Sequence, residues 1–204
     1  GDLNGQNGWQ TSPSNTALVQ TQTVYEGSQA LSVSSISNQQ STIINLFATS
    51  GANTIWADMR VHAVPAAMPT GAMDAAAAYY FDPAGRLVVY DGQQASNNWV
   101  VLTNHAPVST GVWTRLTLKL DYTTAEWSIY LNGAVVGANL GFAGLRPGFA
   151  AFRIDAGDAF ADELRISTDI HQGSDADSDG MSDLSEMEYF GNTDQTATGD
   201  FDGD

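Results

Sequence analysis

Apolar and polar side chains alternate in short runs along the first 168 residues. In the run 113–122, three leucines occupy every second position, and arginine, threonine and lysine fill the positions between them. Successive side chains of a β-strand point to opposite faces of a sheet, so this run has one buried and one solvated face. Comparable runs occupy residues 54–64, 86–91 and 126–132. The pattern therefore predicts several half-buried β-strands.

Turn-forming residues separate these runs. Residues 82–85 (D-P-A-G) and 91–92 (D-G) are typical turn sequences, and 132–133 (N-G) is a strong hairpin signal. No segment before residue 180 keeps apolar residues at the 3.6-residue period of a helix. Many short strands joined by such turns predict an all-β, antiparallel sandwich or barrel.

Length and composition limit the possible classes of protein. The chain has 204 residues, enough for one sandwich domain with a small appendage, and only 15% of them are charged. It has no cysteine, which excludes disulfides and cysteine-ligated zinc. The longest apolar runs, such as 75–81, are far too short to span a bilayer. The chain begins with glycine and shows no signal peptide, so we expect it to be a piece of a longer protein.

Negative charge is concentrated near the C-terminus. The net charge is −16, of which residues 1–168 carry −5 and residues 169–204 carry −11 without a single base. A step this sharp predicts a domain boundary near residue 169, between a body (1–168) and an acidic segment (169–204). It also argues against a nucleic-acid partner, because no basic stripe is present to meet phosphates.

The acidic segment has the spacing of a calcium-binding loop. From Asp175 it reads D-A-D-S-D-G-M-S-D-L-S-E, with acids at loop positions one, three, five, nine and twelve and a glycine at position six, where the chain must turn sharply. Calcium takes six to eight oxygen ligands, and this spacing wraps them around one ion. The alternative is a disordered, solvated acidic run. The expected ligands are the carboxylates of Asp175, Asp177, Asp179, Asp183 and Glu186 and the backbone carbonyl of Met181.

Apolar residues after the loop predict a short helix. Leu184, Met187 and Phe190 recur at every third position, which predicts two helical turns ended by Gly191. A second loop begins at Asp200, Asp202 and Asp204. The segment 175–204 resembles the calcium loops of dockerins and thrombospondin type 3 repeats, which implies that further domains of the same parent chain follow.

The body also resembles a known group of β-domains. The sequence W-T-R-L-T-L-K-L-D-Y-T-T-A-E-W-S-I-Y-L-N-G (113–133) is similar to the late hairpin of laminin-G-like, concanavalin-A-like jelly rolls. The segments G-Q-N-G-W (5–9), Y-E-G-S-Q-A-L-S-V (25–33) and A-D-E-L-R-I-S (161–167) fit the same group. The resemblance implies a jelly-roll sandwich of two antiparallel sheets with adjacent first and last strands, in a secreted or cell-surface protein.

The resemblance has two further implications. Sugar-binding modules of this group often tie the N-terminal segment to the last strand with a structural ion, which here indicates a second calcium site at Glu26, Gly27 and Asp162. Glycan hydrolases of the group carry E-x-D-x-x-E or E-x-D-x-E on one strand, because retaining hydrolysis needs two close acids. No such segment exists in residues 1–168, so we do not expect an enzyme.

One face of the predicted strand 54–64 has side chains suited to sugars. It carries Trp56, Asp58, Arg60 and His62, whereas the other face is apolar. Aromatic rings cover apolar sugar faces, and charged side chains form paired hydrogen bonds with hydroxyl groups. This face is therefore a candidate glycan groove. The alternative is that it is only the solvent face of one strand.

Two further residues join the predicted glycan-binding set. Arg153 alternates with an aspartate along residues 149–155, and Trp99 follows the polar loop 93–98. Trp99 also belongs to the densest aromatic cluster of the sequence, together with Tyr90 and residues 79–81. Ordinary core packing is the alternative for Trp99.

Together these features predict a non-catalytic carbohydrate-binding module of a larger secreted protein. Its partner would be a polysaccharide or other glycan, and its cofactor would be Ca²⁺. Two rival hypotheses are an adhesion or spacer domain that binds no glycan and a polysaccharide-cleaving enzyme domain.

Overall fold

The computed structural model describes residues 2, 4–5, 8–12, 16–34, 41–46, 51–70, 75–95, 98–156, 158–168 and 183–190. Within these ranges the chain forms thirteen strands and one helix. The strand pairings in the described residues are antiparallel, which confirms the predicted all-β antiparallel fold.

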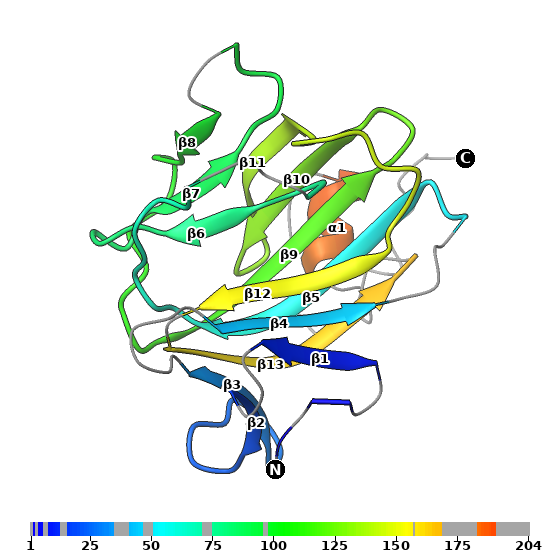
Figure 1. Cartoon of the computed structure of the whole chain (residues 1–204). Coiled ribbons are helices and arrows are strands. Elements are labelled where there is room, and N and C mark those ends of the chain that lie inside the picture. Colours follow the sequence, from blue (N-terminus) through cyan, green and yellow to red (C-terminus); the bar gives the residue numbers. More distant parts are fainter. Residues whose placement is uncertain are drawn as a thin grey trace, which may run out of the picture.

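A seven-stranded sheet forms the centre of the molecule (Figure 1). Its middle is the long pair β5–β9, which is paired from Thr54 opposite Asp121 to His62 opposite Trp113. Three of the runs predicted from alternation appear as β5, β9 and β10 of this sheet, and the run 86–91 appears as a strand (Leu87–Tyr90) of another sheet. In order across the sheet, its strands are β11 (Ala134–Gly141), β10 (Glu126–Leu131), β9 (Trp113–Asp121), β5 (Thr54–His62), β13 (Asp158–Ser167), β3 (Ala30–Ser34) and β2 (Ala17–Gln20).

Local sequence explains how the sheet is connected. Asn132 (φ 50°) and Gly133 (φ 88°) form the tight turn between β10 and β11, because both adopt the left-handed backbone that such a hairpin requires. The last strand, β13, pairs with β3 near the N-terminus. The resemblance implied that the first and last strands are adjacent, but β1 (Trp9–Ser12) lies in another sheet and pairs with β4 (Ser41–Leu46), so β13 is adjacent to the third strand instead.

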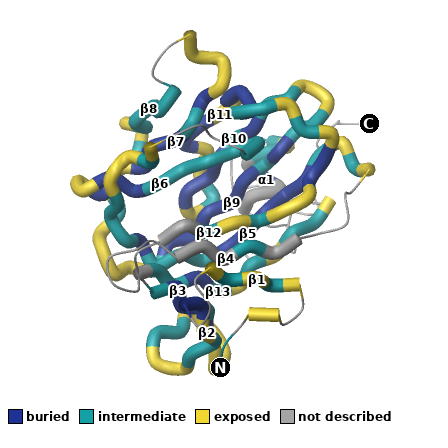
Figure 2. Tube along the Cα trace, in the orientation of Figure 1, coloured by how far each residue is buried: buried dark blue, intermediate teal, exposed yellow. Residues whose placement is uncertain are grey.

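Two three-stranded sheets cover one face of the seven-stranded sheet (Figure 1). Ala57, Met59 and Leu116 of the large sheet pack in one apolar cluster with side chains of β6 and β7. Buried positions follow the middle of the large sheet and β7 (Figure 2). The strands of the small sheets are β1 (Trp9–Ser12), β4 (Ser41–Leu46) and β12 (Ala151–Ala156), and β6 (Tyr79–Phe81), β7 (Leu87–Tyr90) and β8 (Trp99–Val101).

The helix α1 (Asp183–Phe190) lies on the opposite face of the seven-stranded sheet (Figure 1). Its Glu188 carboxylate forms an ion pair with Lys119 of β9 and accepts a hydrogen bond from the Tyr130 hydroxyl of β10 (2.6 Å). The predicted two-turn helix before Gly191 is confirmed. No helix among the described residues has the length and apolar character that a membrane crossing needs.

Candidate functional site

The predicted glycan face of β5 is divided into two halves. At one half, Asp58 is only 6% exposed and forms an ion pair with Arg115, which is 4% exposed. Arg115 donates through Nε and Nη2 to the two carboxylate oxygens of Asp58, each at 2.9 Å, and the Thr117 hydroxyl donates to Oδ1 at 2.6 Å. This is a buried, hydrogen-bonded ion pair, whose groups are already satisfied within the protein.

Trp56 belongs to the same half and is 4% exposed. Its ring packs against Tyr130, with centroids 5.9 Å apart, and the Lys119 ammonium lies 5.3 Å from its centroid. Lys119 and Tyr130 both bind Glu188 of α1, so the helix lies over this half of the face. The prediction that Trp56 and Asp58 line an open groove is contradicted by their burial. Alternation along β5 identified their common face but could not reveal what packs against it.

The other half of the face is partly exposed. The Arg60 guanidinium lies 4.3 Å above the ring of Tyr25, which is 41% exposed, and forms an ion pair with Glu163 at 3.5 Å. The His62 ring lies 5.3 Å from both Trp113 and Phe160. Arg60 and His62 thus remain near solvent, but each is engaged by neighbouring side chains.

The predicted second calcium residues converge beside Arg60. Asp162 accepts backbone hydrogen bonds from Tyr25 (3.0 Å) and Glu26 (3.3 Å) at Oδ2, which ties the segment that contains Gly27 to β13. The pairing register of β13 shifts between Asp162 and Arg165, and Glu163 has a left-handed φ of 50°. The structure therefore places the three predicted residues together, while calcium binding there stays a prediction.

Glu163 is a member of this cluster that the sequence did not single out. Burial raises the pKa of its carboxyl group, the hydrogen-bonded carboxyl of Glu26 raises it further, and Arg60 opposes this shift. Strict alternation places Asp162 and Glu163 on opposite faces of β13. The register shift brings both toward residues 25–26, and no local signal predicts it.

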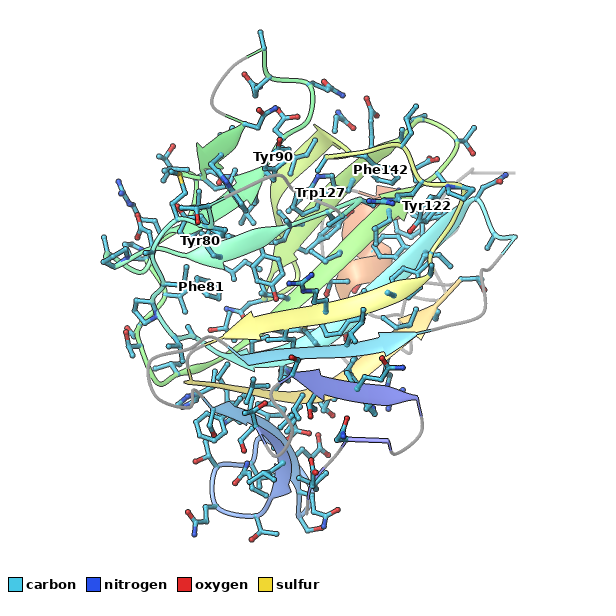
Figure 3. The ribbon with its side chains drawn as sticks, in the orientation of Figure 1. Tyr80, Phe81, Tyr90, Tyr122, Trp127 and Phe142 are labelled. Atoms are coloured by element: carbon cyan, nitrogen blue, oxygen red, sulfur yellow. The ribbon has the colours of Figure 1, made fainter. Side chains whose placement is uncertain are left out.

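Trp99 lies on a different sheet from Trp56. On β6–β7–β8, the side chains of Phe81, Leu87 and Val89 point into the core, so the alternate positions face outward. The outward positions include Tyr80, Tyr90 and Trp99. We call these three half-buried residues the aromatic platform. Its two tyrosines, Tyr80 and Tyr90, are labelled in Figure 3.

The rings of the aromatic platform are in mutual edge contact. Trp99 meets Tyr80 with centroids 5.1 Å apart at an interplanar angle of 82°, and Tyr90 with centroids 5.3 Å apart at 89°. Asp82 and Arg86 form an ion pair near Tyr80. Burial is the main cause that raises the pKa of Tyr80; the charge of Asp82 also raises this pKa, and the charge of Arg86 lowers it. The platform therefore combines aromatic surface with polar groups at its edge.

Asp91 organises the polar loop that leads to Trp99. Its carboxylate accepts backbone hydrogen bonds from Gly141 (2.8 Å) and Gln93 (3.0 Å), and one from the Gln94 amide (2.7 Å). The Asn98 amide in turn donates to the backbone carbonyl of Asp91 at 3.0 Å. The Gln93 amide donates to Glu126 Oε1 of β10 at 3.0 Å, so all three amides of the loop donate hydrogen bonds within the protein.

Two contacts fix this loop to the large sheet. A Cβ atom on Gly92 would lie 1.9 Å from the carbonyl oxygen of Phe142, so only glycine permits this approach. The indole nitrogen of Trp127, a core residue of β10, donates to the backbone carbonyl of Tyr90 at 3.2 Å. The aromatic platform is therefore held by the sandwich core (Figure 3).

Replacing Asp91 with asparagine is expected to lower the free energy of unfolding at pH 7 by about 1–3 kcal/mol. Burial alone would raise the pKa of Asp91, but the hydrogen bonds from Gln94, Gly141 and Gln93 outweigh it, and the net pKa is lowered. The stability that Asp91 contributes is present above about pH 4, the ordinary value for aspartate, and is lost as the pH falls through its lower folded pKa. The loss should therefore shrink in acid, as measured by urea unfolding at several pH values.

Asp121→Asn is the matched control. Asp121 accepts two backbone hydrogen bonds, from Thr123 (2.7 Å) and Thr124 (3.2 Å), both at Oδ1, and asparagine retains this oxygen. Asp91→Asn instead places an amide donor opposite the Gln94 amide. If both variants lost the same free energy of unfolding at every pH, the result would contradict the stabilising role of the Asp91 carboxylate.

The remaining predicted residues do not form one site. Arg153 lies exposed on β12, in a different three-stranded sheet from Trp99. The predicted groove of Trp56, Asp58, Arg60, His62, Trp99 and Arg153 is therefore spread over three sheets. The sequence grouped Trp99 with Tyr90 and residues 79–81. Of this group the structure brings Tyr80, Tyr90 and Trp99 together, while Tyr79 and Phe81 pack in the core.

Most of the predicted calcium loop lies outside the described residues, namely Asp175, Asp177, Asp179 and Met181, as does the second loop at Asp200–Asp204. Of the remaining ligands, Asp183 is the first residue of α1, and Glu186 on its first turn is fully buried. In the part of the chain that the structure describes, no three or more His, Asp or Glu side chains are grouped to hold a metal ion. The calcium loop therefore stays a prediction.

No protein-family model matches the chain, and no curated protein matches it by sequence. Similar solved structures do exist. A sialidase aligns over 81% of this chain but only 14% of its own length, at 13% identity and a TM-score of 0.49. Domain 4 of a GH43 extracellular arabinanase from Geobacillus stearothermophilus, in complex with arabinotriose, aligns over 75% of each chain at 18% identity and a TM-score of 0.44.

The binding domain of botulinum neurotoxin serotype G aligns over 80% of this chain and 44% of its own length, at 11% identity and a TM-score of 0.38. At TM-scores below 0.5, these similarities assign neither a family nor a function to the chain.

Proposed function

We propose that this chain is a non-catalytic carbohydrate-binding module of a larger secreted or cell-surface protein, and that the aromatic platform is its sugar-binding surface. The observation that carries the proposal is the group of three half-buried rings, Tyr80, Tyr90 and Trp99, on the outward face of β6–β7–β8. The C–H faces of sugars pack on aromatic rings, which gain from apolar contact and retain polar atoms for hydrogen bonds.

The surroundings of the platform support this proposal. Gln93 and Gln94 are exposed, and each donates one hydrogen bond within the protein, to Glu126 and Asp91 respectively. Amide groups donate and accept hydrogen bonds, as sugar hydroxyls require. Residues 91–94 and Asn98 are held by the bonds of Asp91 and by the close approach at Gly92, so little conformational entropy of these residues would be lost on binding.

Replacing Trp99 with alanine is expected to weaken polysaccharide binding roughly ten- to a hundredfold, or by about 1.4–2.7 kcal/mol. The loss follows from removal of the central ring, which contacts both tyrosines. Affinity electrophoresis in gels that contain soluble polysaccharides measures the effect.

Tyr25→Ala is the control for this experiment, because Tyr25 is an exposed aromatic residue on the opposite layer of the molecule, beside Arg60 and Trp113. It should bind as the unchanged protein does. Loss of binding in Tyr25→Ala with full binding in Trp99→Ala would move the site to the seven-stranded sheet. If no polymer retards the unchanged protein, the adhesion or spacer hypothesis takes the place of this proposal.

We also propose that Asp175, Asp177, Asp179, the Met181 carbonyl, Asp183 and Glu186 bind one Ca²⁺ ion. Two observations support this proposal. The helix begins at loop position nine, where a calcium loop passes into its exit helix, and Glu186 at position twelve is buried. Burial of a carboxylate is favourable when a cation offsets its charge. A bound ion would hold the start of α1, and hence Glu188, against the sheet.

A further inference from the structure

Every base in the chain is already engaged. Four of the seven form ion pairs, and the other three, Arg146, Arg153 and Arg165, also make hydrogen-bonding, electrostatic or ring contacts. The four ion pairs are Arg60–Glu163, Arg86–Asp82, Arg115–Asp58 and Lys119–Glu188. At least four of the seven positive charges are therefore matched by a carboxylate within the protein.

The arginine next to the aromatic platform is also paired with an acid. Asp82 and Arg86 at its edge neutralise each other. The Asp91 carboxylate is bonded by uncharged donors, namely two backbone amides and the Gln94 side chain. The local charge is thus neutral to negative, in a chain whose net charge is −16.

This charge distribution disfavours acidic glycans. Carboxylate and sulfate groups are recognised by arginine or lysine side chains that can bond them directly, and a negative surface repels them at long range. Neutral sugars need only aromatic surface and uncharged hydrogen-bonding groups. The aromatic platform provides the first, and the exposed amides of Gln93 and Gln94, each with one N–H bonded within the protein, are groups of the second kind.

Ring geometry limits the physical form of the glycan. A crystalline polysaccharide presents a flat surface, and several rings can lie on it only if they are coplanar. Trp99 is nearly perpendicular to Tyr80 (82°) and to Tyr90 (89°). Trp99 and either tyrosine therefore cannot both lie flat on a plane, whereas one sugar of a single chain can stack on one ring and contact the edge of the next.

We infer that the aromatic platform binds single, soluble chains of a neutral polysaccharide, and neither acidic polymers nor crystalline surfaces. This inference rests on the proposed function. It adds the chemical class and the physical form of the ligand.

The test is affinity electrophoresis of the full chain against soluble neutral polymers (β-glucan, mannan, galactan, arabinan and xylan) and acidic ones (polygalacturonate, alginate and a sulfated galactan). Pull-down with crystalline cellulose and chitin forms the third arm. At least one neutral polymer should retard the protein equally at low and high ionic strength, and Trp99→Ala should lose at least about tenfold in affinity. The acidic and crystalline arms should show no binding.

The outcomes separate the two levels of the proposal. Two results would overturn this inference and leave the carbohydrate-binding function intact. One is salt-sensitive binding to an acidic polymer, the other is pull-down by a crystalline polymer, and in either case the binding is lost in Trp99→Ala. Absence of binding in every arm would overturn the proposed function and this inference with it.

Discussion

Replacing Asp58 with alanine is expected to lower the free energy of unfolding by about 3–5 kcal/mol, which is the largest loss that we expect from any polar substitution in this chain. The variant leaves the Arg115 guanidinium in place, almost fully buried and without the carboxylate that it bonds at 2.9 Å through two nitrogens. It also removes the acceptor of the Thr117 hydroxyl. Urea unfolding followed by far-UV circular dichroism measures the loss.

Two further variants isolate the cause. Arg86→Ala breaks the ion pair with Asp82, but half of the Arg86 side chain is exposed, so the loss should stay below about 1 kcal/mol. Asp58→Leu combined with Arg115→Met replaces both charges by apolar groups and should recover most of the stability lost in Asp58→Ala. A double variant as unstable as Asp58→Ala would show that the cost does not come from the unpaired charge.

Replacing Glu186 with alanine is expected to weaken calcium binding by at least about 10–100-fold. Mutation of residues that only hydrogen-bond to metal ligands already lowers metal affinity by this factor, and loss of a ligand should cost at least as much. Glu186 is the expected bidentate ligand at position twelve of the loop, and it is fully buried on the first turn of α1. Isothermal titration of the metal-stripped full chain with calcium chloride measures the affinity directly.

Tyr189→Ala is the control in the same helix. Tyr189 is 72% exposed and lies after the loop, so its removal should leave calcium affinity unchanged. Equal affinity of the unchanged protein and Glu186→Ala would contradict the ligand assignment. Absence of calcium binding in the unchanged protein would favour the solvated acidic run instead.

The strands were predictable because their signal is local. Alternation in 113–122 and 54–64 gave β9 and β5 nearly to their ends, and the Asn132–Gly133 pair gave the hairpin between β10 and β11. A period of two residues depends only on a strand having one buried face. The chain satisfies this condition wherever the large sheet meets the core.

The partners of the polar side chains were not predictable, because they depend on contacts between distant residues. Asp58 and Arg115 are 57 positions apart, and Asp162 bonds the backbone of Tyr25 across 137 positions. The sequence predicted that the face with Trp56 is exposed. In the structure α1 covers it, because Lys119 and Tyr130 bind Glu188, and nothing in residues 54–64 indicates these contacts. Likewise, local sequence gave no sign that Trp56 and Trp99 belong to different sheets.

The most direct test of the carbohydrate-binding claim is to locate the sugar by the indole N–H signals of the five tryptophans in a ¹⁵N-labelled sample. The ligand is an oligosaccharide of the neutral polymer that retards the protein, and Trp99→Phe assigns the signal of Trp99. We expect the Trp99 signal to shift in proportion to saturation, while the signal of Trp56, which is buried on the other face of the seven-stranded sheet, stays in place. Shifts that are largest at Trp56 or Trp113, with Trp99 unaffected, would place the sugar on the seven-stranded sheet and contradict the assignment of the aromatic platform.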